Sequence, residues 1–226
     1  MIPIITIDGP SGAGKGTVAR LVALELGFHL LDSGAIYRIL GLAAAERSVD
    51  FDDVEALVEL ANTLDLSFPF TALHTEIVLN GESVGNKLRT QSVADAASQV
   101  AVHHPVRDAL LGLQRRQARD PGLVGDGRDL GTIVFPDAKL KIFLDASVEV
   151  RAERRYLELI ESGQTVERSA ILRDLEIRDV RDRTRSVAPL VPADDAYVID
   201  SSEQTVNQVM ADVRDLCQAK GLMQDM

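Results

Sequence analysis

The sequence predicts an α/β protein built on a central parallel sheet with helices on both faces. Three observations predict this fold class. Apolar runs of strand length alternate with segments of helical spacing along most of the 226 residues. A glycine-rich segment with a lysine joins the first strand to the first helix. Four aspartates, Asp8, Asp32, Asp126 and Asp145, each end a predicted strand, at the edge where parallel sheets bind ligands.

Composition narrows the class of protein. With 46% hydrophobic and 26% charged residues, the chain is typical of a soluble globular protein with one α/β core and room for an inserted subdomain. The net charge of −11 argues against a protein that coats nucleic acid. A polyphosphate ligand would therefore have to bind at a local basic patch. The single cysteine, Cys217, excludes an intrachain disulfide and favours a reducing compartment. We find no signal peptide and no membrane-length apolar run, and expect a cytoplasmic protein without membrane or nucleic-acid partners.

The glycine-rich segment has the context of a phosphate-binding loop. It follows the apolar run 2–7 and precedes the helical segment 18–26, which Gly27 closes. Its glycines let backbone N–H groups turn toward an anion, the helix N-terminus adds partial positive charge, and Lys15 supplies a full charge at the β- and γ-phosphates. We expect the triphosphate to be bound by Gly9, Pro10, Ser11, Gly12, Ala13, Gly14, Lys15, Gly16 and Thr17.

One position departs from the usual loop. A Ser or Thr that binds magnesium normally follows the lysine, but here Gly16 stands there and Thr17 comes one residue later. This weakens an interpretation as a GTPase or motor ATPase, and the Gly-Lys-Gly-Thr ending resembles the loop of nucleoside monophosphate kinases. It leaves open which protein group, if any, contacts the metal directly.

The next elements follow from periodicity and turn residues. Residues 28–32 predict a strand, and 33–47 a helix for which Ser33 is a candidate N-cap. Residues 52–64 predict a short acidic helix. Residues 66–70 and 75–79, followed by Asn80-Gly81, suggest small antiparallel strands. Because these interrupt the α/β rhythm, the region from about 48 to 90 is interpreted as an insert.

The second half returns to alternating strands and helices. Pro105 marks the start of a helix, since its fixed φ suits the first helical position. Strands are predicted at 123–124, 139–145 and 196–200, the first leading into Gly125-Asp126-Gly127-Arg128-Asp129. Helices are predicted at 91–103, 105–119, 147–162, 167–184 and 203–219.

An arginine-rich segment covers residues 151–185, with nine arginines, eight carboxylates and no lysine. A guanidinium group matches phosphate oxygens with two parallel bonds, so this preference for arginine over lysine indicates phosphate contact. Four residues share one helix face: Arg178, Arg181, Asp182 and Arg185. The alternatives are a solvated face of Arg–Asp pairs and a mobile arm that closes over transferring phosphates. Whether Arg151, Arg154 and Arg155 belong to such an arm or to an exposed helix stays open.

Four motifs in this order carry a family resemblance that runs essentially end to end: the loop at 9–17, Asp32-Ser33-Gly34-Ala35-Ile36-Tyr37-Arg38, Gly125-Asp126-Gly127-Arg128-Asp129-Leu130-Gly131-Thr132, and Arg181-Asp182-Arg183. Together they resemble the bacterial cytidylate kinases. The resemblance implies a P-loop NTPase three-layer fold that moves the γ-phosphoryl group of ATP to CMP or dCMP with Mg²⁺. It implies one kinase domain with a core at 1–32, 91–150 and 186–226, a monophosphate-binding part with its insert at 33–90, and a lid at 151–185.

The resemblance also implies roles for residues at matching positions. Catalysis is assigned to Lys15, Arg128, Arg178 and Arg181. Arg38 and Arg128 would hold the acceptor phosphate. The cytosine ring would be surrounded by Ser33, Arg107, Asp129 and Arg185, and the sugar by Ser98, Arg178 and Asp182. A carboxylate accepts from the cytosine amino group and repels the uracil carbonyl, so Asp129 with Ser33 is expected to read the base. The acceptor phosphate is already anionic, so no general base is needed.

Several alternatives remain beside these assignments. Ser33 could serve only as a helix cap, Ser98 and Arg107 could lie at the surface, and Asp129 could merely orient Arg128. Asp126 could support the phosphate loop, or it could contact magnesium indirectly through water. The ion itself would be held by nucleotide phosphates and water. The four histidines, His29, His74, His103 and His104, lack metal-ligand spacing and are interpreted as structural. Rival functions are a kinase for UMP, shikimate or dephospho-coenzyme A, or a regulator that binds ATP without transfer. We expect a monomer.

Overall fold

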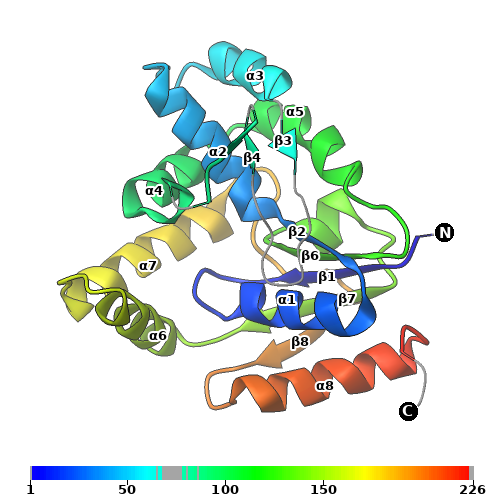
Figure 1. Ribbon diagram of the computed structural model, residues 1–226. Helices are drawn as coiled ribbons and strands as arrows, with labels where there is room; N and C mark the ends of the chain where they lie inside the picture. Colours follow the sequence, from blue (N-terminus) through cyan, green and yellow to red (C-terminus); the bar gives the residue numbers. More distant parts are fainter. Residues whose placement is uncertain (1, 65, 68–77, 80, 86, 224–226) are drawn as a thin grey trace.

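A five-stranded parallel sheet forms the centre of the computed structural model, which describes residues 2–64, 66–67, 78–79, 81–85 and 87–223. Its strand order is β2-β6-β1-β7-β8. In that order the strands span His29–Asp32, Leu123–Gly127, Ile4–Asp8, Leu140–Asp145 and Tyr197–Asp200. Every pairing is parallel, and helices lie on both sides of the sheet (Figure 1). The predicted fold class is therefore confirmed.

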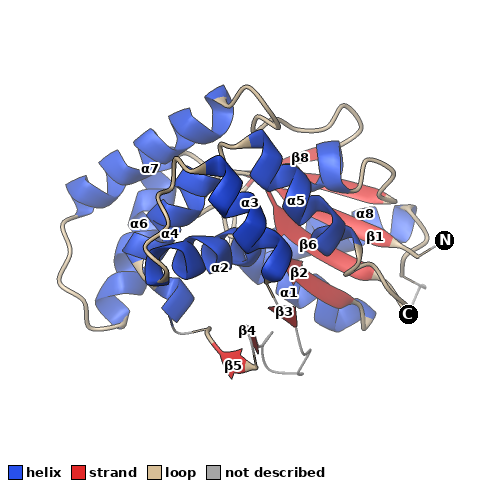
Figure 2. Ribbon diagram, turned by 90° about the horizontal axis from the view of Figure 1, so that it is seen from above, coloured by secondary structure: helices blue, strands red, loops and turns tan. Residues whose placement is uncertain are grey.

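Two apolar layers bury the two faces of the sheet. Leu123 and Val124 of β6 belong to different clusters, because successive side chains of a strand point to opposite faces. The Val124 face is covered by α1 (Lys15–Leu26) and α8 (Val206–Ala219). The other face is covered by α2 (Ser33–Glu46), α3 (Val54–Thr63), α4 (Gln91–Val100) and α5 (His104–Arg115). Figure 2 looks down on the α3 and α5 side.

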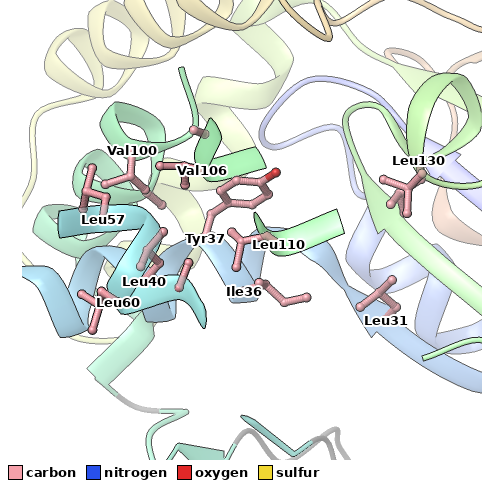
Figure 3. Close-up of a cluster of buried hydrophobic side chains, with 14 of the residues drawn as sticks. Leu31, Ile36, Tyr37, Leu40, Leu57, Leu60, Val100, Val106, Leu110 and Leu130 are labelled. Atoms are coloured by element: carbon pink, nitrogen blue, oxygen red, sulfur yellow. The ribbon is translucent and has the colours of Figure 1, made fainter. Parts of the chain in front are cut away.

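Helix α2 lies at the centre of the second layer. Ile36, Tyr37 and Leu40 point from it into a cluster with Leu57 of α3 and Leu110 of α5 (Figure 3). The N-cap predicted for this helix was wrong. Asp32 is the cap, and its Oδ1 accepts the Ala35 N–H at 2.9 Å, whereas Ser33 is already the first helical residue.

The predicted insert contains a second, antiparallel sheet of three short strands. These are β3 (Leu66–Ser67), β4 (Val78–Leu79) and β5 (Glu82–Ser83). Pairing of 66–67 with 78–79 agrees with the prediction, while the rest of the two predicted strands, and Asn80, lie outside the described residues. The sequence predicted neither β5 nor the 3₁₀ turn η1 (Lys87–Arg89).

Helices α6 (Val148–Glu161) and α7 (Arg168–Thr184) form a separate pair, called the helical arm below. They pack on each other through Ala152, Ile171 and Leu175. The arm lies beyond the carboxyl ends of the strands (Figure 1). It therefore stands beside the edge where ligands of parallel sheets bind.

A π-helical turn, η2 (Leu130–Val134), follows β6 directly and was not predicted. The buried Asp8 carboxylate at the end of β1 accepts the N–H groups of Leu130 at 2.9 Å and Gly131 at 2.7 Å. Asp8 thereby fixes the turn that directly follows Arg128 and Asp129 at the carboxyl edge. Among the described residues, no helix has both the length and the apolar character needed to cross a membrane.

Candidate active site

A cleft of about 1020 Å³ opens at the carboxyl edge of the sheet. The glycine-rich loop and the N-terminus of α1 line one part of it, and α2, α4 and α5 line another. The helical arm contributes a further wall, from Arg154 of α6 to Asp182 of α7. One continuous space therefore joins the loop to the predicted acceptor residues.

The loop bends as the sequence predicted. Gly12 and Gly14 have φ angles of 82° and 94°, which L side chains rarely adopt. Gly9 lies so close to β7 that a Cβ there would stand 2.0 Å from the Leu144 carbonyl oxygen. Helix α1 begins at Lys15 itself, so the lysine and the first helical N–H groups lie at the same point.

Lys15 is only 5% exposed and forms a long ion pair with one carboxylate. Its Nζ donates to the Pro10 carbonyl at 2.8 Å and stands 3.9 Å from Asp126. Burial, followed by the charge of Arg128, lowers its pKa to about 7. Burial also raises the pKa of Asp126, although Lys15 opposes that rise. An anion at this point would restore the full charge of Lys15.

Three arginines gather where the loop meets the helical arm. Arg128 donates from Nε to Asp182 at 3.1 Å, and Arg38 stands 3.7 Å from Asp32. Burial, and then the charge of Arg128, lowers the pKa of Arg178 to about 10. Within the described part of the chain, Nε of Arg178 is buried without a hydrogen-bond partner. Arg178, with an unpartnered Nε beside two further arginines, favours an anionic ligand at this point.

The far end of the cleft holds a buried ion pair. Asp129 is 3% exposed and accepts from Arg107, which also donates to the Ala101 carbonyl at 3.1 Å. The Arg107 guanidinium stands 5.3 Å from the centre of the Tyr37 ring, within cation–π range. A carboxylate fixed in this way presents an acceptor of defined direction to the cleft.

The structure brings almost all predicted site residues to this cleft. Every residue predicted to bind the acceptor lines it: Ser33, Arg38, Ser98, Arg107, Arg128, Asp129, Arg178, Asp182 and Arg185. Gly9, Pro10 and Arg181 do not. Arg181 instead donates to Ser98 Oγ at 3.0 Å, which joins α7 to α4.

Several alternatives are now decided. Ser98 and Arg107 are each 7% exposed, so their interpretation as surface residues is wrong. Asp129 pairs with Arg107 and not with Arg128. His29 and His103 bond to backbone carbonyls, and His104 pairs with Asp108. His74 lies outside the described residues.

Arg151 and Arg154 attach the helical arm to the core. Arg151 is 3% exposed and donates to the Ser11 carbonyl of the loop at 3.0 Å and to Asp179 of α7. Arg154 donates to Ser201 at 3.1 Å and lines the cleft. Arg155 also lines the cleft, and it pairs with Glu158, which is more exposed. All three arginines therefore lie on the helical arm, and Arg154 and Arg155 line the cleft.

Two residues of the acceptor end were missed. Tyr37 stands one helical turn after Ser33, and that spacing was a usable signal. Gln114 of α5 accepts from Ser33 Oγ at 2.7 Å across 81 positions of the chain. No local pattern marks Gln114, because its role depends on the packing of α5 against α2.

Comparison with known proteins gives one consistent result. The family model described as cytidylate kinase matches residues 5–219. The chain is 57% identical to the cytidylate kinase of Enterobacter sp. (strain 638), over 92% of each chain. It is 53% identical to that of Aeromonas salmonicida (strain A449), over 94% of this chain and 93% of the relative. A solved shikimate kinase from Acinetobacter baumannii, in complex with shikimate, has a TM-score of 0.45 and 18% identity over 99% of this chain and 97% of that one.

Proposed function

The chain belongs to the cytidylate kinase family, and from this premise we propose that it moves the γ-phosphoryl group of ATP to CMP or dCMP in the cleft described above. One observation supports this assignment most. A single space runs from the phosphate-binding loop, past partly buried arginines, to a carboxylate fixed by its own ion pair. A donor and an acceptor nucleotide could meet there phosphate to phosphate.

At the donor end, the loop N–H groups and Lys15 would hold the β- and γ-phosphates. Lys15 lies at the first turn of α1, where its charge adds to that of the helix N-terminus. The developing charge of the transferring group would be stabilised from the other side by Arg128 and Arg178. Positioning and charge neutralisation then account for the catalysis, and no general base is required.

At the acceptor end, different residues would bind the phosphate and recognise the base. Arg38 and Arg128 would grip the phosphate that all nucleoside monophosphates share. Arg107 contacts Oδ2 of Asp129, and Oδ1 would accept from the amino group of cytosine. Uracil carries a carbonyl at that position, so the same carboxylate would repel UMP. We assign Ser98, Asp182 and Arg185 to the remaining sugar and base contacts.

Arg181 needs a different account from the other arginines. Its side chain is held by Ser98 and does not line the cleft. Direct contact with a phosphate would require α7 to shift. We therefore propose that residues 151–185 act as a lid, that residues 33–90 form the monophosphate-binding part, and that the remaining segments form the core.

The residues present fit a hydrated Mg²⁺ rather than a site made entirely of protein. In the described part of the chain, no group of three His, Cys, Asp or Glu side chains could hold a metal ion. Magnesium usually keeps several waters and takes one or two carboxylates together with phosphate oxygens. Asp126, which stands 3.9 Å from Lys15, is a candidate carboxylate for such an ion. The ion would neutralise phosphate charge there.

A coupled assay of ATP consumption tests this function. CMP and dCMP should support turnover far better than UMP, and shikimate or no acceptor should support none. Turnover with shikimate or dephospho-coenzyme A alone would favour another acceptor, and ATP binding without transfer would favour a regulator.

We also propose that the protein is a monomer in the cytoplasm. Sedimentation would test the oligomeric state, and cell fractionation would test the location.

A further inference from the structure

We propose that Gln114 is a positioning residue for base selection: it takes the proton of the Ser33 hydroxyl and so makes Ser33 a hydrogen-bond acceptor toward the cleft. This inference rests on the proposed function, because it concerns the base of the acceptor nucleotide. Gln114 belongs to none of the sets assigned to ATP, CMP or catalysis above.

Gln114 and Ser33 form a buried pair. Gln114 is 1% exposed and Ser33 is 3% exposed. The Ser33 hydroxyl donates to Gln114 Oε1 at 2.7 Å. Ser33 lines the cleft, while Gln114 stands behind it on α5. Gln114 therefore influences a ligand only through Ser33 and its other neighbours.

Gln114 also lies near the Tyr37 phenol. Burial raises the pKa of the Tyr37 phenol to about 12, and a hydrogen bond from Gln114 is among the contacts that oppose the rise. A bond that favours the ionised phenol is one in which the amide N–H donates to the phenol oxygen. The amide oxygen faces Ser33, and we infer that the amide nitrogen faces the Tyr37 phenol.

This orientation decides what Ser33 can offer to a base. A hydroxyl has one proton and two lone pairs. Because the Ser33 hydroxyl donates its proton to Gln114, only its lone pairs can interact with a ligand in the cleft. Such an oxygen accepts a hydrogen bond from the amino group of cytosine. It cannot bond to the uracil carbonyl, because both groups are acceptors. If the amide were reversed, its N–H would donate to Ser33, and the Ser33 hydroxyl could then donate its proton to the uracil carbonyl.

Tyr37 lies between the Ser33–Gln114 pair and the Arg107–Asp129 ion pair. The Tyr37 ring lies against the Arg107 guanidinium, and Arg107 in turn holds Asp129. Figure 3 shows Tyr37 rising from α2 next to Val106 and Leu110 of α5. Tyr37 would thus help to orient both polar groups that are proposed to contact the base, its ring through Arg107 and its hydroxyl through Gln114.

The test is the CMP-to-UMP ratio of kcat/KM in the variant Gln114→Met, which keeps the side-chain volume but removes the acceptor. We expect the ratio to fall roughly fivefold to tenfold, the effect of about one hydrogen bond. The fall should come from KM of the two acceptors, with kcat for CMP changed little. Gln117→Met is the matched control, because Gln117 bonds to the Leu113 carbonyl and does not line the cleft.

A double-mutant cycle identifies the route of the effect. In a Ser33→Ala background, Gln114→Met should lower the ratio no further, because the hydroxyl that it positions is gone. An equal loss for both nucleotides in Gln114→Met, with the ratio unchanged, would assign Gln114 a merely structural role and overturn the proposal.

Tyr37→Phe provides a second route if Gln114→Met does not fold. It keeps the ring against Arg107 and removes only the oxygen that orients the amide. The ratio should again fall, and an unchanged ratio in folded Tyr37→Phe would also overturn the proposal. A ratio near one in the unmodified enzyme would instead refute the proposed function itself.

Discussion

Arg128 and Asp182 form an ion pair of 3.1 Å that joins the end of β6 to α7 across 54 positions of the chain. The next residue, Asp129, takes a different partner, Arg107 of α5. Two neighbouring charges on one turn are therefore fixed by two separate elements. This separation is what allows phosphate holding and base reading to be tested independently.

Lys15→Ala should lower kcat by roughly 10²-fold or more, because a charge that acts on the transferring phosphates is lost. Steady-state turnover with saturating ATP and CMP measures the effect. Lys141→Ala is a matched control, since Lys141 is also buried but pairs with Asp195 away from the cleft. Near-normal turnover in folded Lys15→Ala would refute the role of the loop.

Arg151→Met should destabilise the fold by about 3 kcal/mol, because it removes a buried guanidinium and leaves the partly buried Asp179 and the Ser11 carbonyl without their partner. Arg155→Met, four residues later on α6, removes only an exposed pair and should cost less than about 1 kcal/mol. Urea unfolding measures both. Equal costs would show that Arg151 does not anchor the helical arm.

Asp8 should make stability depend on pH. Burial raises its pKa from 3.8 to about 7, so between these values the folded chain holds a proton that the unfolded chain has lost. The stabilisation is complete below the unfolded pKa and disappears as the pH rises toward 7.

Compared with Asp8→Asn, the unmodified chain should therefore lose free energy of unfolding across this window, by up to about 1.4 kcal/mol per pH unit. Urea titrations at pH 4, 5, 6 and 7 on both proteins give the difference. Parallel pH curves for the two would contradict the assignment.

Features that depend on neighbours in the chain could be predicted from the sequence. The loop with Lys15 and the strands before Asp8 and Asp32 are such features, because glycine freedom and side-chain periodicity act locally. The shared helix face of Arg178 and Asp182 was predictable for the same reason.

Features that depend on packing between distant elements could not be predicted in the same way. The partner of Asp129 was one of these. The adjacent Arg128 was the obvious candidate, but the actual partner is Arg107 of α5. Ser33 illustrates the same limit. Its residue type favours a cap, but Asp32 takes that role and Gln114 draws the Ser33 hydroxyl away.

Arg128→Ala and Asp129→Ala should give opposite specificity profiles. Loss of Arg128 should weaken use of CMP and UMP by similar factors, because the phosphate carries no base information. Loss of Asp129 should collapse the CMP preference, since CMP loses an acceptor and UMP loses a repulsive neighbour. Each effect should be on the order of 1–3 kcal/mol or larger. Asp129→Asn serves where Asp129→Ala leaves Arg107 unpaired and the fold too weak.

The ratio of kcat/KM for CMP to that for UMP, measured on the unmodified enzyme and on these variants, tests the central claim most directly. We predict a large ratio that survives in Arg128→Ala and falls toward one in the Asp129 variants. Matching losses in the Arg128 and Asp129 variants, with an unchanged ratio in both, would contradict the assignment of base reading to Asp129.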